Sequence, residues 1–591
     1  MPRVQRTFGW IQNPSSTDNL KKIVSLFVKD SDFHTSMLQN RLPLLRDAHL
    51  LETAELYDSF VNALSQTKIS YVLLKGYGCG SGSRSNAKCS GLAQAALTGQ
   101  QFKTYVIDGK SIRIKKPYTD DWTADGFLRW AVSLGFLDYN YDDDTCSLSE
   151  SGRAFVLAKT KTEENSILGN AYLAYPPACR ILGILSDGNH YTKFEIGKLL
   201  GFTDEAGFTS IPQNIWVQAY ETASSQNEKS KLRSNFEGSS DKYARMICGW
   251  LEHIGWVAKS PKQVTETIGS NSYTTTIGAA FSITAEGLKN YKRAIGKSSS
   301  ARIPKIVYRE MLASKAPQAE LLRKRRATIL KYIGGVQKRS LPQIVEHLQS
   351  HGLEATETIV KDDLKGLKYI GLNIVNQYGE YHLLDTITKL IVPTTIEVDE
   401  DSQASIIRER VREKLQHIDH KYLNLIDYSF EGKDNRIFEI FTIDLLTNEL
   451  HFIGRHLGGS RKPDGIISHN QRGVIIDNKA YSKGFTIDRH MADQMIRYVQ
   501  ENNERRPERN PNKWWEYFPS DIVTFNFVFI SSLFRGDIHS ALSGIKESTG
   551  TNGAALNTEN LLYFAEAIKG GLLSYDAFME KLNHNTEVTY S

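Results

Sequence analysis

One pattern occurs three times in the first two thirds of the chain, and it constrains the fold more than any other feature of the sequence. Apolar residues at helical spacing lead to a glycine, and two strand-like segments that flank a polar loop follow. The three glycines, Gly135, Gly255 and Gly371, lie at domain-sized intervals. A helix, a glycine and a hairpin form the end of a winged helix-turn-helix module, whose last helix can enter a DNA major groove. Other helical modules can end in this way, but three copies favour tandem winged helices.

The last third contains a buried strand that suddenly carries charge. Val474 to Ile476 are apolar, and Asp477, Asn478 and Lys479 follow them directly. Side chains alternate along a strand, so Asp477 and Lys479 are expected on one face and Asn478 on the other. An Asp and a Lys on a surface hairpin would form a screened ion pair of little energetic value. The apolar context favours a functional site instead.

A short hairpin would bring a second carboxylate to this strand. Pro463 to Ile467 is typical of a strand, and the residues that follow it are turn formers. If the turn is centred between Asn470 and Gln471, Asp464 lies directly opposite Asp477. The sequence therefore predicts two carboxylates side by side, with a lysine two residues beyond one of them.

Two adjacent carboxylates indicate a metal site. They repel each other and raise each other's pKa unless a cation lies between them. A small number of oxygen ligands suits Mg2+, which leaves room for waters and a phosphate. The expected ligands are Asp464, Asp477 and the backbone carbonyl of Asn478. Such an ion polarises a phosphoryl oxygen and acidifies an attacking water, while Lys479 can stabilise charge that builds on the phosphate.

Length and composition set bounds on the function rather than assigning it. A chain of 591 residues forms several domains, and a net charge of +5 is compatible with nucleic acid without being diagnostic. The five cysteines show no C-x-x-C spacing, which argues against a disulfide framework or a zinc site and fits a reducing cytoplasm. The sequence contains no signal peptide and no apolar run long enough to span a membrane. A cytoplasmic protein with no membrane partner is therefore expected.

Polar segments predict the domain boundaries. Lys297 to Ser300 is typical of a linker, and the acidic stretch from Pro393 to Gln403 is suited to a tether. The basic run from Arg323 to Arg326, at the start of a predicted helix, can touch phosphates or pack on a neighbouring domain. The expected units are residues 1–165, 166–300 and 301–392, a linker at 393–403, and residues 404–591.

The motifs resemble those of a known family. Pro463-Asp464 followed by Asp477-Asn478-Lys479 matches the PD-(D/E)xK nuclease signature. The longer strings HLGGSRKPDG and DNKAYS are far more specific, and they resemble the cleavage domain of FokI-type IIS restriction endonucleases. RTFGWIQNP, DGFLRWA, GFTSIP and EGSSDKYARM are similar to the recognition region of that family and come in the same order. The resemblance covers essentially the whole chain.

The resemblance implies a fold and an activity. Three winged-helix-like α+β recognition subdomains would precede an α/β nuclease domain with a mixed central sheet. The first two subdomains would bind an asymmetric GGATG-like site in duplex DNA, and the third would mainly hold the domains together. With Mg2+ and the catalytic residues Asp464, Asp477 and Lys479, the nuclease would cut both strands at a fixed distance outside that site and leave 5′-phosphates. A separate DNA methyltransferase would protect the DNA of the bacterial host.

The resemblance also implies residues that contact the DNA bases. Gln and Asn side chains can form hydrogen bonds with adenine, and Arg and Lys can form them with guanine. Glu can accept a hydrogen bond from cytosine. Ser234 departs from the family, which has an asparagine there, so the resemblance leaves the recognition sequence open at roughly one base pair. An insertion within residues 101–118 precedes Trp122, which can equally be a core residue. The matching positions are Gln12, Asn13, Arg84, Gln100, Trp122, Ser234, Glu237 and Lys242.

Dimerisation is a further expectation. Asp493 and Arg497 are four residues apart on a predicted helix, and taken alone they would form a weak surface ion pair. The matching residues in the family pair reciprocally across a two-fold axis, as an isologous interface permits. Because one active site cuts one strand, a homodimer of the cleavage domain on DNA is expected.

Other polar residues near the hairpin have two interpretations each. Glu439 lies in an apolar helix and can support the metal site or extend to the surface. His456, Arg461 and Lys462 flank the hairpin and can hold phosphate. Two other functions also stay open from the sequence: a structure-specific repair or resolvase-type nuclease, and a winged-helix DNA-binding regulator with a vestigial nuclease domain.

Overall fold

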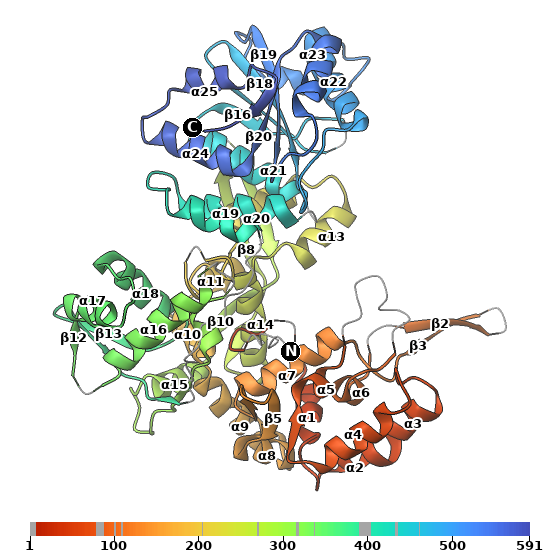
Figure 1. Cartoon of the computed structure of the whole chain (residues 1–591), viewed down its shortest axis with the longest axis vertical. Helices are drawn as coiled ribbons and strands as arrows, with labels where there is room; N and C mark the ends of the chain where they lie inside the picture. The colour runs from red at the N-terminus through yellow and green to blue at the C-terminus, as the bar shows by residue number, and fades with distance from the viewer. Residues whose placement is uncertain are drawn as a thin grey trace.

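The chain folds into a group of small modules and an α/β domain that lies at one end of the molecule (Figure 1). The computed structural model describes all residues except 1–7, 13, 78–87, 100–101, 108–109, 204, 269–270, 315–317, 336, 389, 391–402, 432–434, 460 and 591. Among the described residues, no helix is both long and apolar enough to cross a bilayer.

The three predicted repeats are present, and each contains a three-stranded antiparallel sheet with the same strand order. Gly135, Gly255 and Gly371 follow the helices with φ of +74°, +78° and +109°, a conformation that other residues adopt only at a cost. Three winged-helix modules are therefore confirmed. Their helices and strands are α7 (Asp121–Ser133) with β1 (Lys68–Ser70), β4 (Leu137–Asn140) and β5 (Thr145–Leu148); α14 (Ser239–His253) with β6 (Tyr191–Thr192), β7 (Val257–Lys259) and β10 (Ala280–Ile283); and α18 (Glu357–Tyr369) with β12 (Arg339–Ser340), β13 (Ile374–Gln377) and β14 (Glu380–Leu383).

Further helices complete the cores of the modules, and α9 (Lys161–Ala174) connects the first module to the second. In the second module, a hairpin of β8 (Lys262–Ile268) and β9 (Asn271–Ile277) is inserted between β7 and β10. In the first, β2 (Phe102–Ile107) and β3 (Lys110–Lys115) form a separate ribbon that projects from the module (Figure 1). The other α-helices of the three modules are α1 (Thr17–Ser25), α2 (Asp32–Ser36), α3 (Leu42–Asp47), α4 (Leu56–Ser65), α5 (Tyr71–Lys75), α6 (Leu92–Ala96) and α8 (Glu150–Leu157); α10 (Pro176–Leu185), α11 (Lys193–Gly197), α12 (Gln213–Glu221), α13 (Gln226–Asn235) and α15 (Ala285–Ala294); and α16 (Ala319–Ile333) and α17 (Leu341–Ser350).

A buried ion pair between Arg326 and Glu205 fastens the third module to the second. Arg326 on α16 contacts Glu205 and donates to Asp363 at 2.7 Å, and Arg325 donates to the same Asp363 carboxylate at 2.5 Å. Arg323 is also buried and donates to backbone carbonyls. The prediction that this basic run touches phosphates is wrong for the three arginines, because their guanidinium groups are used inside the protein. The alternative, packing on a neighbouring domain, is confirmed.

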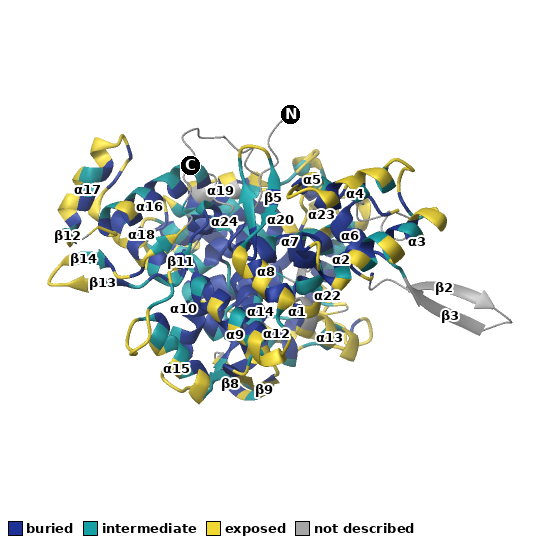
Figure 2. Ribbon diagram, turned by 90° about the horizontal axis from the view of Figure 1, so that it is seen from below, coloured by how far each residue is buried: buried dark blue, intermediate teal, exposed yellow. Residues whose placement is uncertain are grey.

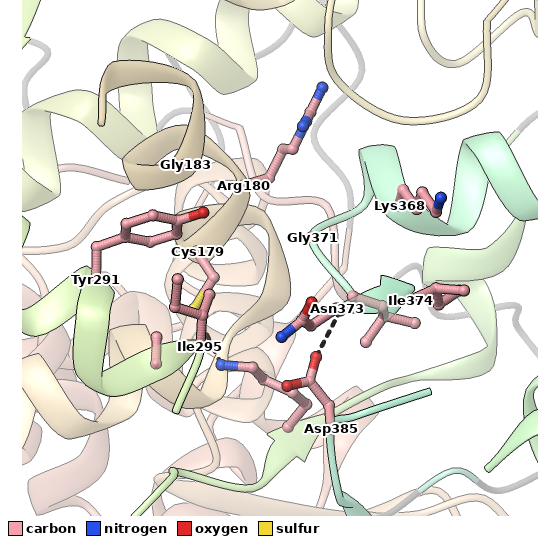
Figure 3. A pocket seen from close by; sticks show the side chains of 13 residues that line it. Cys179, Arg180, Gly183, Tyr291, Ile295, Lys368, Gly371, Asn373, Ile374 and Asp385 are labelled. Atoms are coloured by element: carbon pink, nitrogen blue, oxygen red, sulfur yellow. Dashed lines mark hydrogen bonds between the residues drawn. The ribbon is translucent and has the colours of Figure 1, made fainter. Parts of the chain in front are cut away.

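A polar cavity of about 180 Å³ lies in the same seam between the second and third modules (Figure 3). On one side, Lys305 of β11 (Lys305–Ile306) donates to the sulfur of Cys179 at 3.1 Å. On the other, Asp385 accepts from the backbone N–H of Asn373 at 2.7 Å. The contact of Lys305 joins the third module to α10 of the second, so the cavity belongs to the domain seam.

The α/β domain is built on one six-stranded sheet with the order β16-β17-β18-β19-β20-β21. The first three strands are antiparallel and the last four are parallel, which confirms the predicted mixed sheet. The strands are β16 (Ile453–His456), β17 (Gly465–His469), β18 (Arg472–Lys479), β19 (Thr524–Ser531), β20 (Gly553–Asn557) and β21 (Thr586–Val588).

Helices cover both faces of this sheet. One face packs with α19 (Gln403–Arg412), α20 (Asn424–Glu431), α21 (Asn435–Asp444), α24 (Thr558–Lys569) and α25 (Tyr575–Lys581). The other packs with α22 (Arg489–Glu504) and α23 (Ile538–Thr549). The burial colours of Figure 2 show buried residues gathered in the interior and exposed residues on outer helices such as α15 and α17.

The α/β domain also packs on the second module. Helix α12 contacts α21. Arg436 on α21 forms an ion pair with Glu228 of α13 and donates to the carbonyl of Thr222 at 2.9 Å. The linker prediction for residues 393–403 falls almost entirely outside the described residues.

Candidate active site

The predicted register is confirmed along the two strands of the hairpin. Strands β17 and β18 are antiparallel, with Gly465 opposite Ile476 and His469 opposite Arg472. Asp464 comes directly before β17, and its N–H donates to the carbonyl of Ile476 at 3.0 Å, where a continued register would use the carbonyl of Asp477. Asp464 therefore lies just beyond the regular pairing, and its side chain meets that of Asp477 at the end of the hairpin.

The side chains of this hairpin form a compact polar group. Lys479 Nζ lies 2.8 Å from Asp477 Oδ2, as expected for two residues on one face of a strand. The backbone N–H of Asn478 donates to Asp464 Oδ2 at 2.6 Å, and the two carboxyl groups are themselves hydrogen-bonded. Asp477 is only 1% exposed. Two acids and a lysine thus meet in a largely dry environment.

Burial dominates the electrostatics of this group. It raises the pKa of Asp464 well above its ordinary value, and the nearby carboxylates of Glu439 and Asp477 raise it further. Burial also raises the pKa of Asp477, against the opposing effect of Lys479. For Lys479, burial acts to lower the pKa, but Asp477 and Asp464 outweigh it and the net shift is upward. The two acids repel each other in the absence of a cation, and the lysine keeps its proton.

The donor atoms fit a hard divalent cation. The carbonyl of Ile476 points toward β17, and carbonyls two residues apart point to the same side of a strand, so that of Asn478 points toward Asp464. Two carboxylates and one carbonyl are a set of oxygens that suits Mg2+, which needs few protein ligands. Among the described residues, no group of three or more His, Cys, Asp or Glu side chains has the geometry of a metal cage. Waters and a substrate phosphate would have to complete the coordination.

Glu439 lies close to this group. His456 Nε2 lies 3.2 Å from Glu439 Oε2, and these side chains are only 3% and 13% exposed. The prediction that Glu439 extends to the surface is therefore wrong. The helix that carries it is held on β18, because Asn478 Nδ2 donates to Thr442 Oγ1 at 2.7 Å and to the Phe438 carbonyl at 3.3 Å. In the sequence, Glu439 stood out because it is the acid in an otherwise apolar helix. Nothing in the sequence indicated that it pairs with His456.

The structure describes only some of the residues that are predicted to contact DNA. Asn13, Arg84 and Gln100 lie outside the described residues, as does the side chain of Ser234 on α13. Gln12 hydrogen-bonds to Tyr243. Trp122, in the first turn of α7, is 54% exposed, so the interpretation as a core residue is wrong. The base contacts themselves stay predictions.

Glu237 already has partners within the protein. Its carboxylate accepts from Lys193 Nζ at 2.5 Å and from Arg245 Nε at 2.8 Å and is buried. It lies two residues before α14, while Lys242 is on that helix and partly exposed. Lys242 is therefore available to contact a base edge. Glu237 could contact a base only if it gave up an ion pair within the protein.

Sequence analysis missed the residue that holds the start of α14. Asp241 is fully buried and accepts from the N–H groups of Ile211 and Gly238, both at 2.9 Å, and from Ser210 Oγ at 2.5 Å. Burial raises its pKa to about 7. An aspartate in a first helical turn is too common a cap to stand out in a sequence.

The predicted dimerisation residues share one exposed surface. Asp493 and Arg497 are both on α22 and both exposed. The helix packs with its opposite face on the sheet. The geometry leaves these two charges accessible to a second copy.

Four family models match the chain along its length. Residues 401–589 match "FokI, cleavage domain" and residues 6–158 match "FokI, recognition domain, subdomain 1". Residues 164–299 match "FokI, recognition domain, subdomain 2", and residues 312–379 match "FokI, D3 domain". The domain boundaries drawn from the sequence stay predictions.

Two curated proteins and two solved structures are similar over nearly the whole chain. Type II restriction enzyme FokI of Planomicrobium okeanokoites is 37% identical over 593 residues, with 99% of each chain covered. Type II restriction enzyme StsI of Streptococcus sanguinis is 30% identical, with 95% of this chain and 92% of StsI covered. The structure of restriction endonuclease FokI and that of FokI bound to DNA both match with a TM-score of 0.84, at 37% and 36% identity, covering 99% of this chain and 100% of theirs. The chain therefore belongs to the FokI family of type II restriction enzymes.

Proposed function

We propose that this chain is a type IIS restriction endonuclease that binds a short asymmetric site in duplex DNA and hydrolyses both strands at a fixed distance outside it. One observation carries the proposal: the carboxyl groups of Asp464 and Asp477 meet at the end of a hairpin, with Lys479 on the face of Asp477. This arrangement occurs in a chain that matches the FokI family from its first module to its last domain.

The residues of the hairpin have separate roles in the proposed reaction. Asp464 and Asp477 supply carboxylate oxygens to Mg2+, and the N–H of Asn478 fixes the orientation of Asp464. When bound, the ion would polarise the scissile phosphate and acidify a water. Lys479, held by Asp477, donates to a phosphate oxygen and stabilises the charge that builds there. Its raised pKa keeps the ammonium protonated at neutral pH, so it acts as a fixed charge rather than as a base.

DNA recognition is assigned to the first two modules. Trp122 at the start of α7 and Lys242 near the start of α14 are exposed or partly exposed at the N-terminal ends of helices, where recognition helices meet base edges. Gln12, Asn13, Arg84, Gln100, Ser234 and Glu237 are the remaining proposed contacts. The third module is proposed to be structural, because Arg325 and Arg326 form buried ion pairs inside the protein.

Cleavage of both strands is proposed to need two copies of the nuclease domain. One hairpin site presents one set of ligands and one lysine, which is enough for one phosphodiester bond. The exposed Asp493 and Arg497 of α22 suit a two-fold pairing in which each residue meets its opposite. A cognate methyltransferase from a separate chain would protect host DNA in a bacterial cytoplasm.

The experiment is cleavage of plasmid DNA with and without Mg2+, followed by run-off sequencing of the ends. Discrete double-strand breaks at a constant offset from one sequence are expected. Asp477→Asn should abolish cutting, and Asp521→Asn, at an exposed carboxyl of the same domain, should not. Smearing, or cutting of branched DNA alone, would support a structure-specific nuclease. Sequence-specific binding without cutting under any condition would support a DNA-binding regulator.

A further inference from the structure

Helix α22 has two faces in different surroundings. Asp493 and Arg497 are exposed to solvent, whereas Tyr498 is 2% exposed and Met495 is fully buried. The two buried side chains belong to the same apolar cluster as Ile475 of β18. One helix therefore reaches from the proposed dimer surface to the central sheet.

The face of the sheet that α22 covers is the catalytic face. Ile475, Asp477 and Lys479 are two residues apart along β18 and so point to the same side. Asn478 points to the other side, where it bonds to α21. Tyr498 is thus in the buried layer that lies over Asp477 and Lys479.

The phenol of Tyr498 is a polar group in this layer, and it is held in place. Gln494 Nε2, one helical turn earlier, donates to the Tyr498 hydroxyl at 2.8 Å. Burial raises the pKa of Tyr498, and the negative charges of Asp477 and Asp464 raise it further. Tyr498 in turn raises the pKa of Lys479. The placement of the phenol beside the acids and the lysine rests on the packing of α22 against β18, where Tyr498 and Ile475 share one apolar cluster.

The ring of Tyr498 also contacts the exposed face of the helix. The guanidinium carbon of Arg497 lies 5.2 Å from the centroid of the Tyr498 ring, within the range of a cation–π contact. A change in the position of Arg497 therefore alters the contact that the Tyr498 ring makes.

We propose that Tyr498 is a positioning residue, through which α22 holds Asp477 and Lys479 in the geometry for cleavage and through which a dimer contact at Arg497 acts on that geometry. The inference rests on the proposed nuclease function and extends it, because it makes pairing of two copies a condition for an aligned active site as well as for the second cut. Misplacement of a catalytic group by about 1 Å can cost about 10²-fold in rate, so a buried support of this kind has a measurable effect.

The first test uses the full chain in single-turnover cleavage of a duplex with one site. Tyr498→Phe removes the hydroxyl and keeps the ring, and Gln494→Ala removes its donor. We expect Tyr498→Phe to lower the maximal rate about tenfold, and Gln494→Ala to lower it less. The protein concentration at half-maximal rate, the DNA affinity and the melting temperature should stay at wild-type values. Tyr590→Phe is the control, because Tyr590 packs with Phe564 on the other face of the sheet.

The second test separates positioning from dimerisation. One copy carries Asp493→Arg and the other Arg497→Asp, so that only mixed pairs form, and Tyr498→Phe is added to the first copy alone. We expect one strand to be cut at the rate of the unsubstituted pair and the other slowly, so that nicked DNA accumulates.

An unchanged maximal rate for Tyr498→Phe, or equally slow cutting of both strands, would overturn the inference. Failure of the mixed pair with intact Tyr498 to cut would instead count against the proposed dimer. In that case the rate of Tyr498→Phe in the otherwise unchanged chain still decides whether the tyrosine positions the site.

Discussion

The backbone N–H of Asn478 donates to the Asp464 carboxylate at 2.6 Å, so the peptide between Asp477 and Lys479 itself orients the acid of the neighbouring strand. No side chain is needed for this contact, and it exists only if the hairpin keeps its register. The three residues proposed for catalysis are thus held together by one strand pairing.

Neutralising either hairpin acid should abolish cleavage without lowering the stability of the fold. Asp464→Asn and Asp477→Asn remove a proposed ligand, and each should lower cleavage by at least about 10³-fold, as for other groups that act as a unit. Because burial and the charge of Glu439 raise the pKa of both acids, their neutral forms fit the metal-free fold. Melting curves without Mg2+ should therefore show no loss of stability, and gel shifts no loss of DNA affinity. A variant that unfolds would contradict this account.

Glu439 should affect metal affinity rather than DNA affinity. Its charge raises the pKa of both hairpin acids, so it adds to the negative field that attracts a cation. Glu439→Gln should raise the Mg2+ concentration for half-maximal cleavage several-fold, and calorimetric titration of the DNA-free protein with Mg2+ should show the same change. Glu516→Gln, an exposed acid of the same domain, is the control. Equal Mg2+ affinities for the two variants would exclude the role.

Asp241 should make stability fall as pH rises. Burial raises its pKa from 3.8 to about 7 in the folded protein, so the folded state binds a proton more tightly than the unfolded state. Between these values unfolding releases a proton, and the free energy of unfolding decreases with pH. Relative to Asp241→Asn, the wild type should lose about 1–3 kcal/mol between pH 5 and pH 8 in urea unfolding. Asp142→Asn, at an exposed carboxyl, should keep the wild-type slope, and parallel slopes for all three proteins would be the contrary result.

Arg326 should be costly to remove. It is buried between Asp363 and Glu205, and its loss leaves the Glu205 carboxylate without this partner at the seam of the second and third modules, while Asp363 keeps Arg325. Breaking a buried pair in this way costs about 3–5 kcal/mol. Arg326→Ala should lower the urea midpoint of the recognition modules accordingly, and Lys324→Ala, in the same run but only half-buried, should have little effect. Equal midpoints would show that the seam does not depend on this pair.

The sequence by itself determined the features that depend on local order. Three glycines end helices before hairpins because only glycine adopts that conformation cheaply, and this made three winged-helix modules predictable. Alternation along β18 placed Asp477 and Lys479 on one face, and the turn residues set the strand register that brings Asp464 beside Asp477 at the end of the hairpin. These relations need only the period of a strand and the length of a turn.

The tertiary structure alone decided which polar groups are already engaged. Arg323 and Arg326 look like phosphate ligands until the third module buries them, and Glu237 meets Lys193 and Arg245 only when α11 and α14 pack. Glu439 and His456 lie on different elements, α21 and β16, yet their side chains meet beside the hairpin. Such pairings come from long-range packing of whole elements, for which no local periodicity carries a signal.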